Sequence, residues 1–170
     1  MKILLIVVGG LALLCIIIFV TGLLLPKGHV ASRSAQFRGT REQLFSLIAG
    51  PQGWRPDVLR YETFPDTDGR ALVRETTRDG ETITYELVNS TPPASVTRRI
   101  ATENLPYSGS WTFSLQPGSG VTVVRITEHG EVHNPVFRFM SRFIFGYTHN
   151  MDTYLQALGK ATGQEIQVRN

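Results

Sequence analysis

A long uncharged apolar run near the N-terminus constrains this chain more than any other feature of its sequence. Residues 3–25 contain no charged side chain, and Pro26 and Lys27 end the run. An α-helix rises about 1.5 Å per residue, so a helix of this length matches the roughly 30 Å hydrocarbon core of a bilayer. The run therefore predicts one transmembrane helix whose partner is the lipid bilayer.

A cleaved signal peptide is the alternative interpretation of the same run. Signal peptides usually have an apolar region of about 7–15 residues, which is shorter than residues 3–25. No good small-x-small cleavage site follows at residues 29–32. The sequence therefore favours an uncleaved, single-pass membrane protein. Positive charges lie on both sides of the run; they slightly favour a cytoplasmic domain but leave the side of the membrane open.

The rest of the chain has the length and composition of one ordinary folded domain. We expect an anchor at residues 1–26, a folded domain at 27–160 and a polar C-terminal tail at 161–170. The formal net charge is only +3, and no block of Lys or Arg indicates a nucleic-acid partner. The only cysteine, Cys15, lies in the anchor, which excludes a thiolate nucleophile or a cysteine metal site in the domain.

The pattern after the anchor predicts one strand, one short helix, six further strands and a long C-terminal helix. Residues 29–37 are the first strand, and Thr40 followed by Gln43 has the capping-box spacing that begins a helix. Turn residues separate six β-rich segments of an antiparallel meander, at 58–64, 70–77, 81–90, 95–102, 108–117 and 121–129. Helical spacing of apolar residues predicts one helix over 135–158, with four residues facing the sheet: Met140, Ile144, Met151 and Leu155.

Two motifs carry a resemblance to a known superfamily. Residues 105–113 (LPYSGSWTF) are similar to a Gly-Gly-x-Trp-x-aromatic strand, with Ser108 in place of the first glycine, and residues 127–138 (TEHGEVHNPVFR) resemble a last-strand-to-helix junction. Both motifs resemble the polyketide cyclase/dehydrase-type branch of the START/Bet v 1-like (SRPBCC) superfamily. The resemblance implies an α+β helix-grip fold, in which a curved antiparallel sheet wraps on a long C-terminal helix, here preceded by one transmembrane helix. It also implies a cavity for hydrophobic molecules between sheet and helix. We expect no cofactor.

Strand alternation predicts which side chains face that cavity. If Asp79-Gly80 is a two-residue hairpin turn, Arg74 pairs with Tyr85 and both point inward. Inward-facing strand positions and aromatic residues near the helix make up the predicted ligand-binding cavity: Trp54, Arg74, Tyr85, Arg98, Trp111, Phe113, Glu128, Phe139 and Phe143. Simple packing remains the alternative role for Trp54, Phe139 and Phe143.

Three of these residues, Arg74, Arg98 and Glu128, bring charge into an apolar interior. A buried charge without a partner costs several kcal/mol, so each needs an ion pair or a polar ligand group. The sequence leaves open a structural ion-pair network, a ligand-orienting role and a local bulge that breaks the alternation. Hairpin arithmetic places Arg98 level with Trp111 and Glu128 level with Gly109, so that the two charges approach across the gap above the glycine.

The sequence predicts no metal site, because its candidate ligands His129, His133 and His149 are spread over a strand end, a loop and a helix. A membrane-anchored binding protein for a hydrophobic small molecule, such as a lipid, a quinone or a polyketide-like compound, is the leading hypothesis for function. The first alternative is a cyclase- or dehydratase-like enzyme that uses Glu128 with Tyr85 or Arg98 as an acid-base pair. The second is an interaction module without a ligand.

Overall fold

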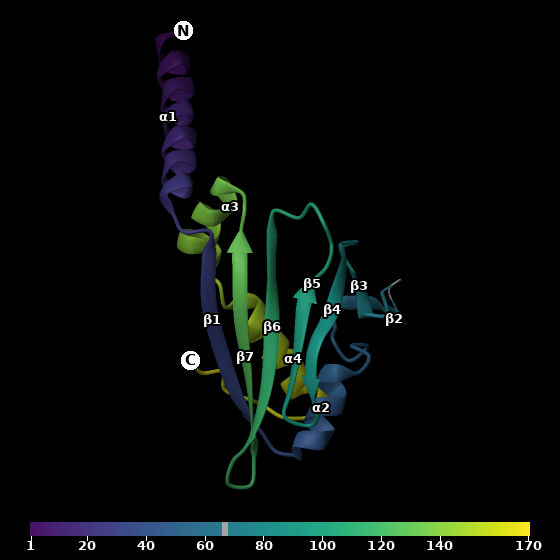
Figure 1. Ribbon diagram of the computed structural model, residues 1–170. Helices are drawn as coiled ribbons and strands as arrows, with labels where there is room; N and C mark the ends of the chain where they lie inside the picture. Colours follow the sequence, from purple (N-terminus) through teal and green to yellow (C-terminus); the bar gives the residue numbers. More distant parts are fainter. Residues whose placement is uncertain (66–67) are drawn as a thin grey trace.

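The computed structural model describes residues 1–65 and 68–170 (Figure 1). In these residues, antiparallel strands form a seven-stranded sheet in the order β1-β7-β6-β5-β4-β3-β2. The strands are β1 Gly28–Phe37, β2 Val58–Pro65, β3 Ala71–Thr77, β4 Thr82–Thr91, β5 Ser95–Ile100, β6 Tyr107–Pro117 and β7 Thr122–Val132. The antiparallel meander predicted from the sequence is therefore confirmed, and β1 and β2 form the two edges of the sheet.

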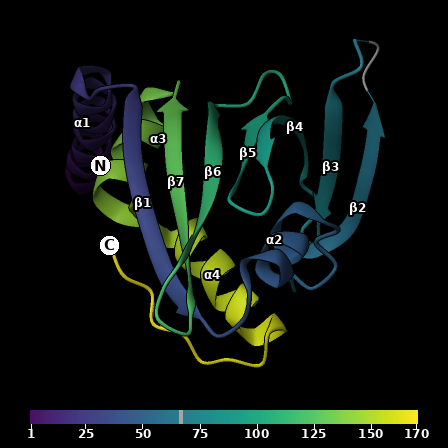
Figure 2. The same cartoon turned by 60° about the horizontal axis from the view of Figure 1, so that its bottom comes forward.

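The helices cover one face of the sheet and one of its ends. They are α1 Lys2–Leu24, α2 Arg41–Ala49, α3 Pro135–Met140, the π-helix η1 Ser141–Phe145 and α4 His149–Ala161. Figure 2 shows α4 lying across the concave side of the curved sheet, with α2 beside its C-terminal end. This arrangement confirms the helix-grip fold class. The apolar helix α1 projects away from the sheet (Figure 1) and, among the described residues, is the one helix long and apolar enough to cross a membrane.

Local sequence accounts for the start of α2. The side chain of Thr40 accepts a hydrogen bond from the backbone N–H of Gln43, and the Gln43 side chain accepts one from the backbone N–H of Thr40. This reciprocal capping box satisfies two N–H groups that the first helical turn leaves without partners. The predicted cap is thus confirmed, and it holds α2 in the connection between the two edge strands.

The core joins the concave face of the sheet to α2 and α4. Phe113 and Leu115 of β6 and Ile126 of β7 are buried with residues of the helices: Leu44, Ile48, Met151, Tyr154, Leu155 and Leu158. Two of the four residues that the sequence places against the sheet, Met151 and Leu155, are fully buried as predicted. Most of the apolar burial is therefore at the α4 end of the domain.

The predicted single helix over 135–158 is wrong, because the chain breaks at Gly146. This glycine has φ 74° and ψ 172°, a conformation that side-chain-bearing residues rarely adopt, and α4 begins only at His149. Apolar residues continue at helical spacing on both sides of Gly146, which is why the sequence pattern does not reveal the break. Ile144 is consequently 59% exposed instead of facing the sheet, and Met140 is only half-buried.

The C-terminal segment 161–170 packs along the outside of β1. Ile166 and Val168 contact the core cluster, and the backbone of Arg169 exchanges two 2.8 Å hydrogen bonds with the backbone of Ser34. The segment that the sequence sets apart as a polar tail therefore covers part of a sheet edge that would otherwise expose unpaired N–H and C=O groups.

Candidate functional site

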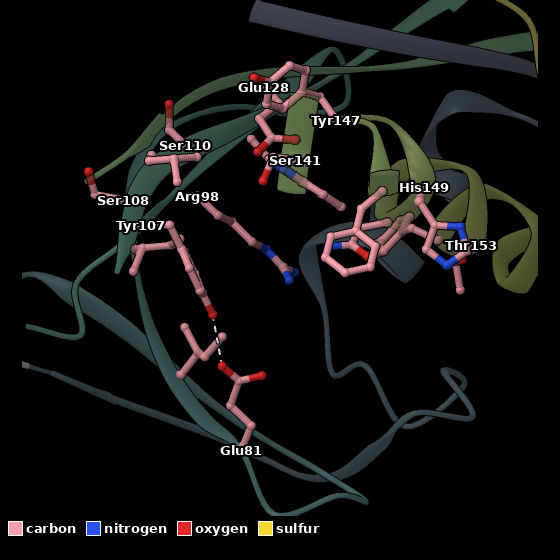
Figure 3. Close-up of a pocket in the computed structure, with 18 of the residues that line it drawn as sticks. Glu81, Arg98, Tyr107, Ser108, Ser110, Glu128, Ser141, Tyr147, His149 and Thr153 are labelled. Carbon is pink, nitrogen blue, oxygen red and sulfur yellow. Dashed lines mark hydrogen bonds between the residues drawn. The ribbon is translucent and has the colours of Figure 1, made fainter. Parts of the chain in front are cut away.

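A cavity of about 1020 Å³ lies between the concave face of the sheet and the helical segments that follow β7. This volume is at the upper end of the range of about 300–1,000 Å³ that is usual for small-molecule sites. Figure 3 shows Arg98 reaching into the space, with Tyr107 and Glu81 along one side and His149 on the other. The cavity has room for a ligand much larger than a few water molecules.

Aromatic and aliphatic side chains form much of the cavity wall. Trp111 and Phe113 come from β6, and Tyr85 comes from β4, as strand alternation predicts. The helical side contributes Phe137, Ile144 and Phe145. Predominantly apolar walls with a few placed polar groups are typical of sites for small organic ligands.

A buried ion cluster closes the floor of the cavity. Glu75 is 3% exposed, and its two carboxylate oxygens lie 3.2 Å from Arg98 Nη1 and 2.7 Å from Arg55 Nη1. Arg98 also donates a hydrogen bond to the backbone carbonyl of Ile48, and Arg55 pairs with Asp57. The charges of this cluster are therefore compensated within the protein. Nη1 and Nη2 of Arg98 are committed to structural partners, whereas its buried Nε has no hydrogen-bond partner among the residues that the structure describes.

The predicted inward position of Arg74 is wrong, and Glu75 takes it. The β3–β4 hairpin has three residues between Thr77 and Glu81 instead of two, with Gly80 at φ 92°, and this pairs Arg74 with Thr84 and Glu75 with Ile83. A register shift of one residue moves every side chain to the opposite face. Arg74 consequently lies on the outer face, 4.8 Å above the Phe64 ring.

Glu75 is a site residue that the sequence reasoning missed. The only sequence signal for it is Val73, which stands two positions earlier and shares its face. Because Arg74 and Glu75 are adjacent and both charged, alternation alone does not select one of them.

The predicted approach of Arg98 and Glu128 is also wrong. Arg98 does lie opposite Trp111, as predicted, but Glu128 lies opposite Trp111 as well, and Gly109 pairs with Gly130. The register of β6 and β7 is shifted by two residues from the prediction, which preserves the inward face of Glu128. The side chain of Trp111 therefore stands between the two charged residues, whose strands are about 10 Å apart.

Glu128 has His29 of β1 as its neighbour, 3.4 Å from Nε2 to Oε1. The imidazole stacks on the ring of Tyr147 with 3.9 Å between centroids. Gly130 makes room for this pair, since a Cβ there would collide with both the imidazole and the Glu128 carboxylate. The Glu128 side chain is 22% exposed and lines the cavity, so its carboxylate is available to a ligand. Sequence alternation reveals neither His29 nor Tyr147, because their contact depends on the chain path after Gly146.

The tyrosines of the site are hydrogen-bond donors at neutral pH. Burial, followed by the nearby charge of Glu75, raises the pKa of Tyr85 well above its usual range. Burial and the 2.8 Å hydrogen bond to Glu81 raise the pKa of Tyr107 to about 12. Burial also raises the pKa of Tyr154, whose hydroxyl donates to Gln52 over 3.0 Å. None of these phenols becomes an anionic base under ordinary conditions.

In addition to Arg74, three predicted cavity residues do not line the cavity. Trp54 packs against the core and donates a 3.0 Å hydrogen bond to the carbonyl of Leu47, while Phe139 and Phe143 contact each other with 4.9 Å between ring centroids. Packing, the alternative role for these residues, is what the structure shows for Trp54 and Phe139. Phe143 is 59% exposed, so its ring is covered by neither the core nor the cavity.

Charged groups around the cavity are predominantly acidic. In the part of the chain that the structure describes, the cavity is lined by one further cation, Arg78, and by four carboxylates in addition to those that pair with Arg55 and Arg98: Asp79, Glu81, Glu128 and Glu131. Among the described residues, no group of three or more His, Cys, Asp or Glu side chains is arranged to hold a metal ion.

Comparisons with known proteins give matches at the level of structure. No family model matches this chain, and no curated protein does. Norcoclaurine synthase from Thalictrum flavum matches with TM-score 0.62 and 13% identity over 88% of this chain and 92% of that chain. The di-domain ARO/CYC protein StfQ of the steffimycin biosynthetic pathway matches with TM-score 0.62 and 13% identity, over 80% of this chain and 51% of that chain.

A bacterial protein gives a similar result. A conserved protein from Geobacillus kaustophilus matches with TM-score 0.60 and 14% identity over 82% of this chain and 99% of that chain. Such low identities are informative about architecture and not about activity. Together with the curved sheet and its C-terminal helix, they show that this chain has the Bet v 1-like helix-grip fold.

Proposed function

We propose that this protein is a membrane-anchored binding protein for a hydrophobic small molecule held between the sheet and the C-terminal helices. The observation that carries the proposal is the cavity of about 1020 Å³ with its aromatic walls. Burial of an apolar ligand against such walls is favourable by roughly 25 cal/mol per Å² of apolar surface removed from water. The anchor α1 supports the proposal because lipophilic molecules concentrate in the bilayer that this helix is suited to cross.

The charges around the cavity indicate which polar group such a ligand carries. Arg98, which could have bound a carboxylate, is already paired with Glu75 and with the carbonyl of Ile48. The accessible carboxylate of Glu128 accepts hydrogen bonds and repels anions. We therefore propose that the ligand presents a hydroxyl or amine donor, or a positive charge, in preference to a carboxylate.

A pair of related fluorescent probes tests this proposal. N-phenylnaphthylamine is neutral and has an N–H donor, whereas anilinonaphthalenesulfonate adds one anionic group to the same skeleton. In the Trp54→Phe variant of the full chain, reconstituted in lipid nanodiscs, Trp111 is the remaining tryptophan and lies in the cavity wall. We expect saturable energy transfer from Trp111 to the neutral probe, and weaker binding of the sulfonate.

Glu128→Gln separates the effect of charge from the effect of shape. This change should narrow the difference in affinity between the two probes, whereas Glu103→Gln, on an exposed residue outside the cavity, should leave it unchanged. The absence of saturable transfer with both probes would overturn binding in the cavity. Tighter binding of the sulfonate would overturn the proposed preference for a donor group.

An enzyme of the cyclase or dehydratase type is the second candidate, and the contact of His29 with Glu128 favours it. A carboxylate that lies 3.4 Å from an imidazole beside an apolar cavity is an arrangement suited to general acid-base catalysis. Tyr85 supplies a neutral hydrogen-bond donor in the same cavity. Mass spectrometry of lipid extracts from purified wild-type and Glu128→Gln protein separates the candidates. A carrier yields the same compound from both proteins, in a smaller amount from the variant, whereas an enzyme yields a product from one and its precursor from the other.

A further inference from the structure

The segment 135–145, formed by α3 and η1, exposes large apolar side chains within a short stretch of chain. Their exposures are Val136 42%, Phe137 49%, Phe143 59%, Ile144 59% and Phe145 62%. Single exposed apolar residues are ordinary, but a contiguous group of this kind indicates a surface that meets a partner or a membrane. No Asp or Glu occurs between Glu131 and Asp152, and Arg142 on the segment is exposed.

This segment is attached directly to the end of the anchor helix. Gly22 of α1 packs so closely on the backbone of Pro135 that no Cβ would fit between them. Figure 1 shows α3 beside the point where α1 leaves the domain. The exposed apolar group therefore lies at the level where α1 would leave a bilayer.

Arg138 holds the two elements together. This arginine is only 5% exposed. Its guanidinium donates hydrogen bonds to the backbone carbonyls of Leu25 at 3.1 Å, Leu23 at 3.5 Å and His133 at 3.1 Å. The last carbonyls of a helix lack intrahelical partners, and a cation at this end is also favoured by the helix dipole. The anchor is consequently fixed relative to the domain and is not a flexible tether.

The same segment forms part of the cavity wall. Phe137, Ser141, Ile144 and Phe145 line the cavity, and so do Gly146 and Tyr147, which follow the segment. The π-helical turn of η1 and the break at Gly146 interrupt regular helix at this position. One short element thus separates the cavity from the surface that adjoins the anchor.

We propose that segment 135–145 lies in the interfacial layer of the bilayer that α1 crosses, and that it forms a lateral port between the bilayer and the cavity. The bilayer is the occupant of this surface because α1 leads into it at the same place. An exposed apolar face that carries one exposed basic residue, Arg142, and no acidic one suits an element that binds at a lipid interface. The port rests on the proposed function, since it supplies the hydrophobic ligand without passage through water.

The depth of segment 135–145 in a membrane can be measured without any ligand. In the full chain with Cys15→Ala, a spin label is attached at Ile144→Cys and, separately, at Leu59→Cys. Leu59 is 63% exposed, close to the 59% of Ile144, but lies on β2 at the opposite edge of the sheet. In nanodiscs of phosphatidylcholine and phosphatidylglycerol, we expect the label at 144 to collide preferentially with oxygen and the label at 59 with a water-soluble nickel chelate. Equal accessibility of both labels to the nickel chelate would overturn the proposal.

The port itself is tested by the rate of transfer. Vesicles loaded with N-phenylnaphthylamine are mixed with nanodiscs that contain the Trp54→Phe chain, and energy transfer from Trp111 is followed in time. Phe143→Asp, whose ring is outside the cavity wall, should slow transfer severalfold while the equilibrium affinity stays unchanged, and Leu59→Asp should have no effect. Identical transfer rates in the Phe143→Asp and Leu59→Asp variants would contradict the proposed port. Absence of probe binding by the unlabelled Trp54→Phe chain, with the label at 144 of the other chain still at membrane depth, would refute the proposed function but leave the membrane-bound surface in place.

Discussion

Arg98 and Glu75 form a buried ion pair beneath the cavity, with 3.2 Å between Nη1 and Oε1 and with side chains that are 6% and 4% exposed. Arg55 binds the other oxygen of the same carboxylate at 2.7 Å. Glu75 therefore compensates two cations, while Arg98 shares its carboxylate partner with another arginine. Because of this asymmetry, we expect the loss of Glu75 and the loss of Arg98 to lower the free energy of unfolding by different amounts.

Glu75→Gln should destabilise the domain more than Arg98→Met. The first change leaves the guanidinium of Arg98 buried without a counter-charge, and breaking a buried pair in this way costs about 3–5 kcal/mol. The second leaves Glu75 paired with Arg55 and introduces an apolar side chain of similar length. Urea unfolding of the full chain in mild detergent measures both free energies. An equal or greater loss for Arg98→Met would contradict the asymmetry.

Substitutions in the C-terminal helices should reveal the break at Gly146. Met151→Ala and Leu155→Ala remove fully buried side chains and should each cost about 2–5 kcal/mol. Ile144→Ala, at a position that is 59% exposed, should change the free energy of unfolding by no more than about 0.5 kcal/mol. A continuous helix facing the sheet would instead make the three losses similar in the same unfolding experiment.

Gly130→Ala should displace His29 from its place beside Glu128. A Cβ at this position collides with the imidazole and with the carboxylate, so we expect a lower melting temperature measured by circular dichroism. His29→Ala in the same chain removes the ring and should restore most of the loss. Failure of this second change to restore stability would mean that the glycine is required by the backbone and not by the histidine.

Arg138→Met should release the anchor from the domain. The change removes the donors to the carbonyls of Leu23 and Leu25, so the linker that follows α1 should open more often. Trypsin cleavage after the exposed Lys27 measures this opening and should accelerate severalfold. Arg142→Met, which changes an exposed arginine of the same segment, is the control and should leave the cleavage rate unaltered.

We expect the contribution of Asp57 to the free energy of unfolding to change with pH only at acidic pH. Partial burial alone raises the pKa of Asp57, but the hydrogen bond and the charge of Arg55 outweigh burial and hold this pKa below its usual value. A depressed carboxyl pKa contributes stability above the unfolded value of about 3.9, and this stability is lost as pH falls through the folded value. The difference in unfolding free energy between wild type and Asp57→Asn should be constant above about pH 5 and shrink below about pH 4. A constant difference down to pH 2 would contradict the ion pair with Arg55.

Patterns that depend on neighbouring residues predict much of this fold. The length and apolarity of residues 3–25 predict the helix α1, and Thr40 with Gln43 predicts the start of α2, because helix length and capping depend on local geometry. The order of the strands follows from turn residues between β-rich segments. The inward positions of Trp111, Phe113 and Arg98 also follow, since alternation is a property of each strand alone.

The identity of the partners in the site depends on tertiary structure. One additional residue in the hairpin after Thr77 exchanges Arg74 for Glu75 at the cavity, because side chains alternate with a period of two. The contact of His29 with Glu128 and Tyr147 joins three segments that are distant in sequence, and it requires both the space at Gly130 and the break at Gly146. Sequence by itself determines which elements form and which face of each is apolar, since these are local free-energy preferences. Only the tertiary structure decides which charges meet, because a shift of one residue between strands costs little locally and changes every contact across the sheet.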